Sequence, residues 1–461
     1  MKDVKSATAS KGVVLLIAAM SSFLTPFTSS SVNIALPSIG TKLSLNAISL
    51  SWVATAYLLA AAVFLVPFGR IADIYGRKRI LQFGMIITTI ASVLCTTSNS
   101  AAWLISFRAL QGLGSAMIFG TGVAILTSVF PANERGRALG INVAAVYSGL
   151  SVGPLVGGFL TGQFGWRSIF LLNAFLGLLV TVMVFWKLKG EWAEARGESF
   201  DYGGSIIYGA AMFTLIYAFS VLPALWGLWL ILLGILGFVG FFTWEMKLEH
   251  PIFNVALFRN NAVFAYSNLA ALINYSATFA VGFLLSLYLQ YVKGFSPQQA
   301  GLILIVQPVI MVICSPLAGS LSDRIEPRIV SSIGMTMTTV GLLILAFLGN
   351  NTSLAFIFVS LVIQGIGLGF FSSPNTNAVM GSVDRKFYGV ASGVLGTMRL
   401  TGQMFSMGMS LLLFSLYIGR VQITPDVYPL FLKSMKMVFT ISTMLCFAGI
   451  FASISRGKAH Q

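Results

Sequence analysis

Two arginines lie inside otherwise apolar stretches of the chain, where a charged group could act on a polar partner. Arg108 and Arg399 each stand in a run of apolar and small residues about 20 residues long, the length of a helix that crosses a bilayer. Burying a guanidinium at that depth is costly, so a functional role is the default expectation for both. The structural alternative is that each side chain bonds to carbonyl groups or extends along its helix toward the membrane surface.

Acids are missing from the centres of the same stretches. The thirteen Asp and Glu residues all fall in predicted loops, tails or helix ends. Cys95, Cys314 and Cys446 each stand alone in a predicted helix, and His250 and His460 supply no partner at metal-ligand spacing. We therefore expect no metal site, no cofactor and no enzymatic activity, and we interpret the cysteines as inert buried thiols.

A basic motif that contains one acid follows the second apolar run. Residues 69–79 read Gly-Arg-Ile-Ala-Asp-Ile-Tyr-Gly-Arg-Lys-Arg and form a predicted cytoplasmic turn. Its Asp73 could dock on a neighbouring helix end through charge-assisted hydrogen bonds and be released on opening. The alternative is a loop whose positive charge only orients the chain. This motif and a similar segment at 319–324 could together form a conformational gate. The predicted gate residues are Gly69, Asp73, Gly76, Arg77, Lys78, Asp323 and Arg324.

The elements that must position these residues are membrane helices. Of the 461 residues 57% are hydrophobic and only 9% charged, and the mean hydropathy is +0.89. Lipid is therefore the expected solvent for most of the chain. A β-barrel is excluded because the apolar runs are continuous and do not alternate. We predict an all-α integral membrane protein with fourteen transmembrane helices, arranged as two pseudo-symmetric six-helix bundles plus a central inserted helix pair.

Basic residues orient these helices. With the N-terminus in the cytoplasm, 20 of the 28 Lys and Arg residues lie in cytoplasmic segments, six lie outside and two lie within helices. This bias satisfies the positive-inside rule and accounts for the net charge of +15 without nucleic acid. A multi-pass cell-membrane protein with both termini cytoplasmic is expected. Its predicted parts are an N-terminal tail (1–12), a six-helix bundle (13–188), a central two-helix insertion with linkers (189–261), a second bundle (262–454) and a C-terminal tail (455–461).

The two bundles share an internal repeat. A Gly-Arg-Ile-Ala-Asp segment at 69–73 precedes Gln-Gly-Leu-Gly at 111–114. About 250 residues later, Gly-Ser-Leu-Ser-Asp at 319–323 precedes Gln-Gly-Ile-Gly at 364–367. Two halves of common design, with a cavity between them at mid-membrane, are what alternating access requires.

These motifs resemble those of the major facilitator superfamily, and the resemblance covers essentially the whole chain. Residues 69–79 are similar to its signature loop between the second and third helices, and residues 108–114 to its fourth-helix motif. Residues 149–158, Gly-Leu-Ser-Val-Gly-Pro-Leu-Val-Gly-Gly, resemble the fifth-helix motif of its exporters. The two extra central helices resemble its fourteen-helix drug:proton antiporter branch. A plain helix-packing role is equally open for Gly149, Gly153, Pro154 and Gly157.

One departure from the antiporter pattern affects the expected mechanism. Where that branch typically has an acid in its first helix, this chain has Thr28. The resemblance implies that polar side chains on the cavity-lining helices bind the solute, although any single amide or tyrosine could instead be an interhelical contact. The predicted substrate-binding residues are Arg108, Gln111, Asn33, Tyr57, Tyr147, Asn274, Gln307, Asn375 and Arg399.

The resemblance implies a secondary active or facilitative transporter that moves a small organic solute by alternating access. Two intramembrane arginines without an acid favour a neutral or anionic solute over a cation. The exporter-like motif favours efflux of drug-like compounds, and the alternative is nutrient uptake, for example of a planar vitamin such as riboflavin. A membrane-embedded sensor or scaffold with the same fold is a third class. The expected partners are a small-molecule substrate and membrane lipid, with no nucleic acid, and a monomer is expected.

Overall fold

The computed structural model describes residues 10–131, 134–248, 251–253, 255–322, 324–384 and 388–456. Within these ranges the chain is almost entirely helical and contains no strand. Fourteen segments in them are long and apolar enough to cross a membrane. The predicted fold class, an all-α membrane protein with fourteen membrane helices, is therefore confirmed.

The first bundle has six long helices whose ends follow from local sequence. Three begin after a capping residue, since the side chains of Ser10, Asn46 and Ser100 accept from the backbone N–H three residues later. Two end at a glycine with positive φ, Gly76 at +120° and Gly165 at +79°, where a side chain would be strained. The helices are α1 (Lys11–Lys42), α2 (Ala47–Tyr75), α3 (Arg77–Thr97), α4 (Ala101–Val129), α5 (Arg135–Phe164) and α6 (Arg167–Lys187).

The second bundle also has six membrane-crossing segments, but three of them are interrupted. Its elements are α10 (Ala262–Thr278), α11 (Ala280–Leu287), the π-helical turn η1 (Tyr288–Val292), α12 (Pro297–Leu304), α13 (Val306–Ser322), α14 (Pro327–Leu345), α15 (Leu354–Gly381), α16 (Tyr388–Tyr417), the 3₁₀ turn η3 (Pro425–Val427) and α17 (Tyr428–Ile454). One span runs from α10 through α11 into η1, one from α12 into α13, and one from η3 into α17.

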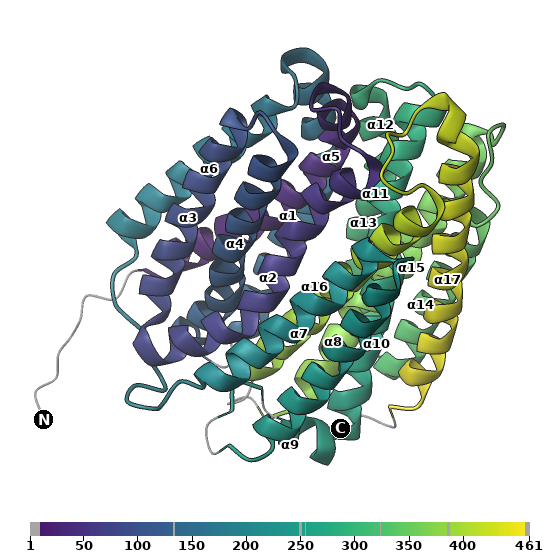
Figure 1. Ribbon diagram of the computed structural model, residues 1–461. Coiled ribbons are helices and arrows are strands. Elements are labelled where there is room, and N and C mark those ends of the chain that lie inside the picture. Colours follow the sequence, from purple (N-terminus) through teal and green to yellow (C-terminus); the bar gives the residue numbers. More distant parts are fainter. Residues whose placement is uncertain are drawn as a thin grey trace, which may run out of the picture.

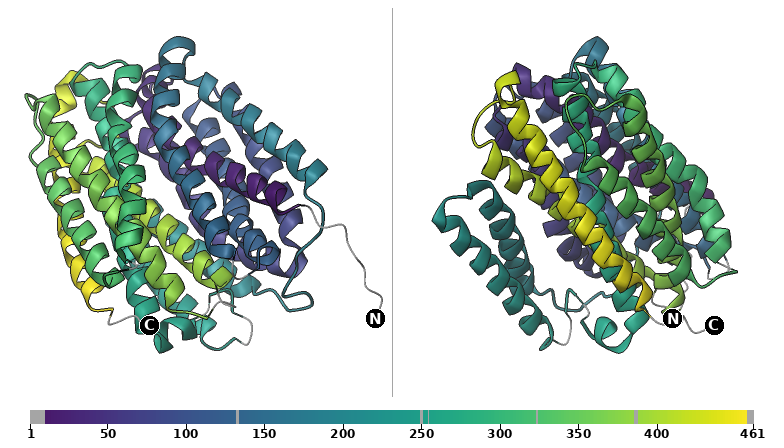
Figure 2. Two further views of the ribbon diagram at one scale, coloured as in Figure 1. Left: turned by 180° about the vertical axis from the view of Figure 1, so that it is seen from behind. Right: turned by 90° about the vertical axis from the view of Figure 1, so that its right-hand side faces the viewer.

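A helix pair stands between the bundles in sequence and beside them in space. It consists of α7 (Tyr202–Val221) and α8 (Leu225–Glu245), and the short helix α9 (Val255–Asn260) leads on to the second bundle. The two helices pack on each other, and α7 also contacts α2 and α16. The right-hand view of Figure 2 shows the pair standing at one side of the molecule. Tyr208 on α7 fastens it there, because its hydroxyl donates to the Ala62 carbonyl of α2 at 3.2 Å.

The two bundles repeat the same helix contacts. In the first, α1 packs along α5, α2 on α4, and α3 on α4 and α6; in the second, α10 packs along α16, α13 on α15, and α14 on α15 and α17. The repeat extends to single residues. A Cβ on Gly114 would lie 2.8 Å from the Gly84 carbonyl oxygen, and one on Gly367 would lie 2.8 Å from that of Gly334. Figure 1 shows the first bundle on the left and the second on the right.

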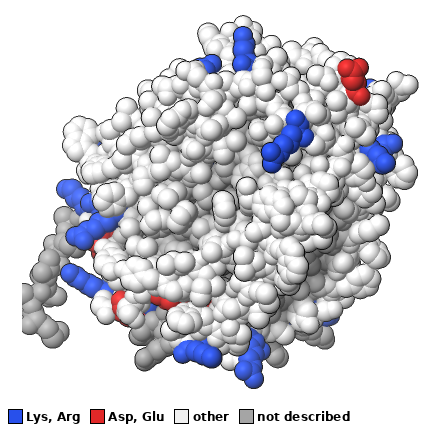
Figure 3. Space-filling model, in the orientation of Figure 1, with Lys and Arg blue, Asp and Glu red and all other residues white. Residues whose placement is uncertain are grey.

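The surface fits a lipid environment. On the face shown in Figure 3, charged side chains lie at the top and upper right and along the left and lower edges, and a wide uncharged area separates the two groups. Large apolar side chains point outward from the membrane-crossing helices, for example Phe175, Trp229 and Phe451, each more than half exposed. Exposed apolar area on this scale is expected where lipid covers the protein.

The motif at 69–79 is more helical than predicted. α2 continues through Gly69 and Asp73 to Tyr75, and α3 begins at Arg77, so Gly76 alone forms the turn. The prediction of a turn across the whole motif is therefore wrong. The physical reason is that one glycine inside a helix costs only about 1 kcal/mol, which the surrounding residues of a long buried helix offset.

Candidate functional site

A chain of hydrogen bonds joins the two bundles near the middle of their helices. Tyr147 on α5 shares a hydrogen bond with Ser372 on α15, and the Thr376 hydroxyl donates to the Ser372 carbonyl at 2.8 Å. Arg399 on α16 donates from Nη2 to Thr376 Oγ1 at 2.8 Å. Its guanidinium carbon lies 5.7 Å from the ring centroid of Tyr275 on α10. These five residues are called the central cluster below.

The positive charge of the central cluster has no acidic partner. Among the described residues no Asp or Glu pairs with Arg399, and its Nε is buried without a hydrogen-bond partner. The residue as a whole is only half-buried, so part of it remains reachable. A cation and free N–H donor beside tyrosine rings can bind a neutral or anionic group that also has a flat face.

Arg108 occupies a different place. Its side chain is 1% exposed inside the first bundle, where Nε donates to the Val53 carbonyl at 3.0 Å and Nη1 to Gln111 Oε1 at 2.5 Å. The guanidinium also lies 4.3 Å from the ring centroid of Tyr57. Gln111 in turn donates to Ser92 at 2.7 Å. The predicted residues Arg108 and Gln111 are thus hydrogen-bonded to each other, and the Tyr57 ring lies beside the guanidinium. The three form one group within the first bundle, separate from Tyr147 and Arg399.

The amides predicted on the second bundle contact other protein groups or none. Gln307 Nε2 donates to Gln364 Oε1 at 3.4 Å. Gln364 has the position in the second bundle that Gln111 has in the first. Asn375 donates to the Ser267 carbonyl at 3.2 Å. Asn274 is fully buried, and neither of its amide atoms has a partner among the described residues. The structure therefore brings none of these three amides to Arg399.

The backbone carbonyl of Asn33 takes part in a contact between the two bundles. Pro37 has no N–H, so the Asn33 carbonyl lacks its usual helical partner. The Ser286 hydroxyl of α11 donates to this carbonyl at 2.9 Å, and Gln290 of η1 donates to the Ile34 carbonyl at 3.0 Å. A proline in α1 thus frees a carbonyl that a helix of the other bundle uses.

Arg456 is a further buried arginine that the sequence analysis missed, because it places this residue in the C-terminal tail. Arg456 is 1% exposed, and it donates to Asn375 Oδ1 at 3.0 Å, to Ser331 Oγ at 2.9 Å and to the Ser453 carbonyl at 2.7 Å. Burial lowers the pKa of Arg456 to about 10, so it stays charged at neutral pH. No spacing signal could reveal it, because most of its partners come from other helices.

Thr28, at the position of the missing acid, also has a protein partner. Its hydroxyl donates to Asn173 Oδ1 on α6 at 2.6 Å and lies 2.8 Å from the Leu24 carbonyl. A neutral hydroxyl–amide pair therefore stands where the antiporter-like pattern would have a carboxyl group. Asn173 was not among the predicted residues.

Glycines on α5 let it approach α1 closely. A Cβ on Gly157 would lie 2.7 Å from the Ser31 carbonyl oxygen, and one on Gly149 would lie 3.1 Å from the Pro26 ring. Gly153 faces Ser30 in the same way. Pro154 contacts the other bundle instead, since its carbonyl lies against Gly301 at the start of α12.

The predicted gate residues are held by the segment 188–201 between α6 and α7. Arg77 Nε donates to Asp73 Oδ1 at 2.8 Å, and its Nη1 and Nη2 donate to Glu194 at 2.8 and 3.1 Å. Arg77 Nη1 also donates to the Ala124 carbonyl of α4 at 3.2 Å. Asp73 therefore docks on the first turn of α3, and one buried cation joins α2, α4 and the linker.

Two more acids of the same linker fasten its ends. Glu191 accepts from the Lys78 backbone N–H at 2.8 Å, close to Gly76, and Glu198 pairs with Arg70. We call Arg70, Asp73, Arg77, Glu191, Glu194 and Glu198 the linker clamp. A Cβ on Gly69 would meet nothing within 4 Å, Arg324 is exposed, and Asp323 lies outside the described residues.

The clamp changes the acidity of Glu194. Partial burial raises its pKa, but hydrogen bonds and charge from Arg77 and a hydrogen bond from Ser128 lower it more. The net result is a pKa below the usual value of 4.5. Glu194 is therefore ionised at neutral pH and attracts Arg77.

Two membrane-embedded bundles of repeated design, joined at mid-depth by polar side chains, define a membrane transporter and not an enzyme. The Major Facilitator Superfamily model matches residues 18–273 and 267–457. The chain belongs to the major facilitator superfamily, and it is a multi-pass membrane transporter.

Similar proteins agree with this assignment. The chain is 34% identical to the riboflavin transporter RibZ of Clostridioides difficile (strain 630), over 84% of this chain and 85% of that protein. It is 32% identical to the multidrug resistance protein Stp of Mycobacterium tuberculosis (strain CDC 1551 / Oshkosh), over 80% of this chain and 70% of that protein. A bacterial homologue of the human lysosomal transporter Spinster has the same fold, with a TM-score of 0.65, 18% identity, and coverage of 97% of this chain and 96% of that structure.

Proposed function

We propose that this transporter carries a small neutral or anionic organic solute that binds at the central cluster. The observation that carries the proposal is Arg399, a half-buried cation beside Tyr275 and linked through Thr376 to the contact between the bundles. A solute held there touches both bundles, so rocking of one bundle on the other exposes it to each side in turn. Transport coupled to a proton on a carboxyl group of the first helix is not expected, because Thr28 holds that position.

Efflux of drug-like compounds is the direction we propose first. It is supported by the exporter-like glycines of α5 against α1 and by the similarity to Stp. A second candidate is uptake of a planar vitamin, which is supported by the similarity to RibZ and by the tyrosine rings around Arg399. Either solute class is compatible with a cationic site.

Direction and solute are tested together by flux. The purified protein in proteoliposomes is expected to transport radiolabelled riboflavin or an anionic drug, and not a permanent cation such as ethidium. Expression in a riboflavin auxotroph and in a drug-sensitive strain then separates the candidates, since growth on low riboflavin supports uptake and drug resistance supports efflux. Rapid ethidium transport would contradict the proposal, and no flux of any solute would favour a sensor or scaffold.

We further propose that the linker clamp faces the cytoplasm, as do both termini. Ser199 on the linker and Asn351 between α14 and α15 are exposed and lie at opposite ends of the bundle. In a background without the three native cysteines, Asn351→Cys is expected to react with an impermeant maleimide in intact cells. Ser199→Cys should react only after permeabilisation. Reaction of Ser199→Cys in intact cells would reverse the orientation.

A further inference from the structure

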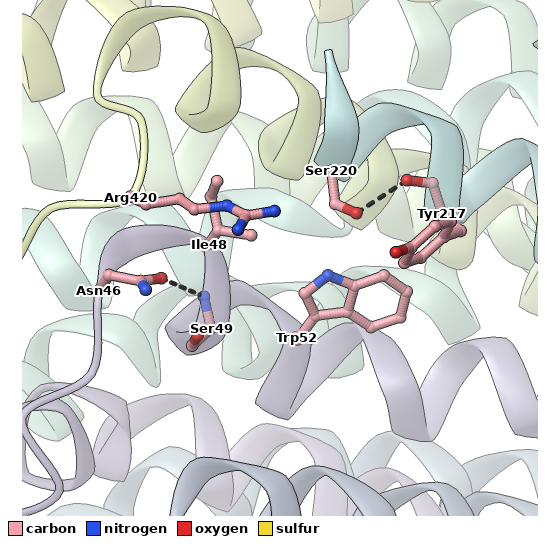
Figure 4. A pocket seen from close by; sticks show the side chains of 7 residues that line it. All are labelled: Asn46, Ile48, Ser49, Trp52, Tyr217, Ser220 and Arg420. Atoms are coloured by element: carbon pink, nitrogen blue, oxygen red, sulfur yellow. Dashed lines mark hydrogen bonds between the residues drawn. The ribbon is translucent and has the colours of Figure 1, made fainter. Parts of the chain in front are cut away.

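A polar pocket lies at the end of the molecule opposite the linker clamp, apart from the central cluster. Its volume is about 210 Å³. Three elements form it: the start of α2, the end of α7 and the loop after α16. The lining residues are Asn46, Ile48, Ser49, Trp52, Tyr217, Ser220 and Arg420, and Figure 4 shows them from close by.

The pocket offers hydrogen-bond donors and positive charge. Arg420 is exposed, its guanidinium extends over Ile48 into the pocket, and it has no hydrogen bond or ion pair to any described residue. The indole nitrogen of Trp52 faces the same space in Figure 4 and is also unpaired among the described residues. No Asp or Glu lines the pocket. An unpaired guanidinium beside a second free donor, with no acid among the lining residues, favours an anion.

Hydrogen bonds and a ring contact hold the pocket walls in place. The Ala47 N–H donates to the Val421 carbonyl at 2.9 Å, which ties the residue after Arg420 to the first turn of α2. On the other side, the Ser415 hydroxyl of α16 donates to the Leu222 carbonyl after α7, and the Ser220 carbonyl lies 3.3 Å from the same hydroxyl. The Trp52 and Tyr217 rings face each other with centroids 6.5 Å apart. The backbone at Val421 and Ser220 and the two rings are therefore held in place, and the exposed Arg420 side chain extends from this fixed frame.

We infer that this pocket binds a phosphate group. A guanidinium recognises phosphate through paired N–H donors, and the volume suits a phosphate with a small attached group. Tryptophan and tyrosine beside a cation at the end of membrane helices are typical of the depth where lipid headgroups lie. The phosphate can belong to an anionic phospholipid or to a free anion. A bound phosphate would bridge α2, α7 and the loop after α16, and would fix the inserted pair to both bundles.

The test measures binding to the purified full-length protein by isothermal titration. The probes are dioctanoyl phosphatidylglycerol, dioctanoylglycerol without a phosphate, and inorganic phosphate. Wild type is expected to bind phosphatidylglycerol and not dioctanoylglycerol. Arg420→Gln should raise the Kd about tenfold or more, as loss of a charge-assisted bond predicts. Trp52→Phe, which keeps a smaller aromatic ring and removes the N–H, should raise the Kd less.

Lys436→Gln is the matched control, because Lys436 is an exposed basic residue near the same end of the molecule outside the pocket. It should leave the Kd unchanged. If inorganic phosphate binds with the same dependence on Arg420, the site takes free anions; if only phosphatidylglycerol binds, it takes lipid. Absence of binding by every probe, an unchanged Kd in Arg420→Gln, or an equal loss in Lys436→Gln would overturn the inference.

Discussion

Replacing Arg77 by glutamine is expected to lower the transport rate about tenfold and the Tm of the purified protein by several degrees. Arg77 contacts Asp73, Glu194 and the Ala124 carbonyl together. Without it the two carboxylates lose their shared partner and the linker separates from α2 and α4. Breaking a buried ion pair costs about 3–5 kcal/mol, but the Glu194 side chain is 63% exposed, so solvent screening reduces the expected cost to about 1–3 kcal/mol.

Arg79→Gln is the matched control for this prediction. The Arg79 side chain is 70% exposed and lies 3.7 Å from Glu191, so its loss should cost less than about 1 kcal/mol. Equal effects of Arg77→Gln and Arg79→Gln, measured by flux and thermal unfolding, would show that the clamp has no special role.

Asp73→Asn should reduce turnover severely at near-normal abundance, since topology depends on Lys and Arg and hardly on acids.

Acid should weaken the same clamp. Because the pKa of Glu194 is lower in the folded protein than its usual 4.5, its pairing stabilises the fold fully above that value. The stabilisation is lost as the pH falls through the lowered pKa. The Tm difference between wild type and Arg77→Gln should therefore be constant near neutral pH and shrink below about 4.5.

The membrane helices and the division into two bundles could be predicted because both follow from local composition. Continuous apolar runs of bilayer length are read directly from the chain. The repeated Gln-Gly-x-Gly pattern also has a local cause, since Gly114 and Gly367 each face a glycine carbonyl on the preceding helix. The glycines that let two helices approach have the same spacing in both bundles, and that spacing is visible in the sequence.

The sequence does not show which polar residues lie inside one bundle and which lie at the contact between the two bundles. Arg108 and Arg399 look alike in sequence, as charges in apolar runs. Arg108 finds its partners within its own bundle, whereas Arg399 lies beside Tyr275 of the second and is linked to Tyr147 of the first. That distinction depends on helix rotation and on side chains hundreds of residues apart.

Arg399→Gln is expected to change which charges the transporter accepts. A unit charge at about 4 Å contributes on the order of 4 kcal/mol at an effective dielectric of about 20, enough to exclude a hydrophobic cation from the central cluster. Glutamine keeps one NH2 donor group on a shorter side chain and removes the charge. The KM for an anionic solute should rise about tenfold or more, and ethidium transport should appear or increase. Arg399→Lys, which keeps the charge but loses the planar fork, should still exclude ethidium.

Arg108→Gln makes the same chemical change at the enclosed arginine and so separates charge selectivity from stability. Its guanidinium holds the Val53 carbonyl and Gln111 Oε1 inside the first bundle, so its loss leaves a buried acceptor unpaired and should lower the Tm. The ratio of anion to ethidium transport should stay as in wild type, because α2, α3 and α4 enclose the group. Flux of both solutes and thermal unfolding would be measured for the two variants side by side. If Arg108→Gln admitted ethidium and Arg399→Gln did not, the solute site would lie in the first bundle and the central cluster would be a structural contact.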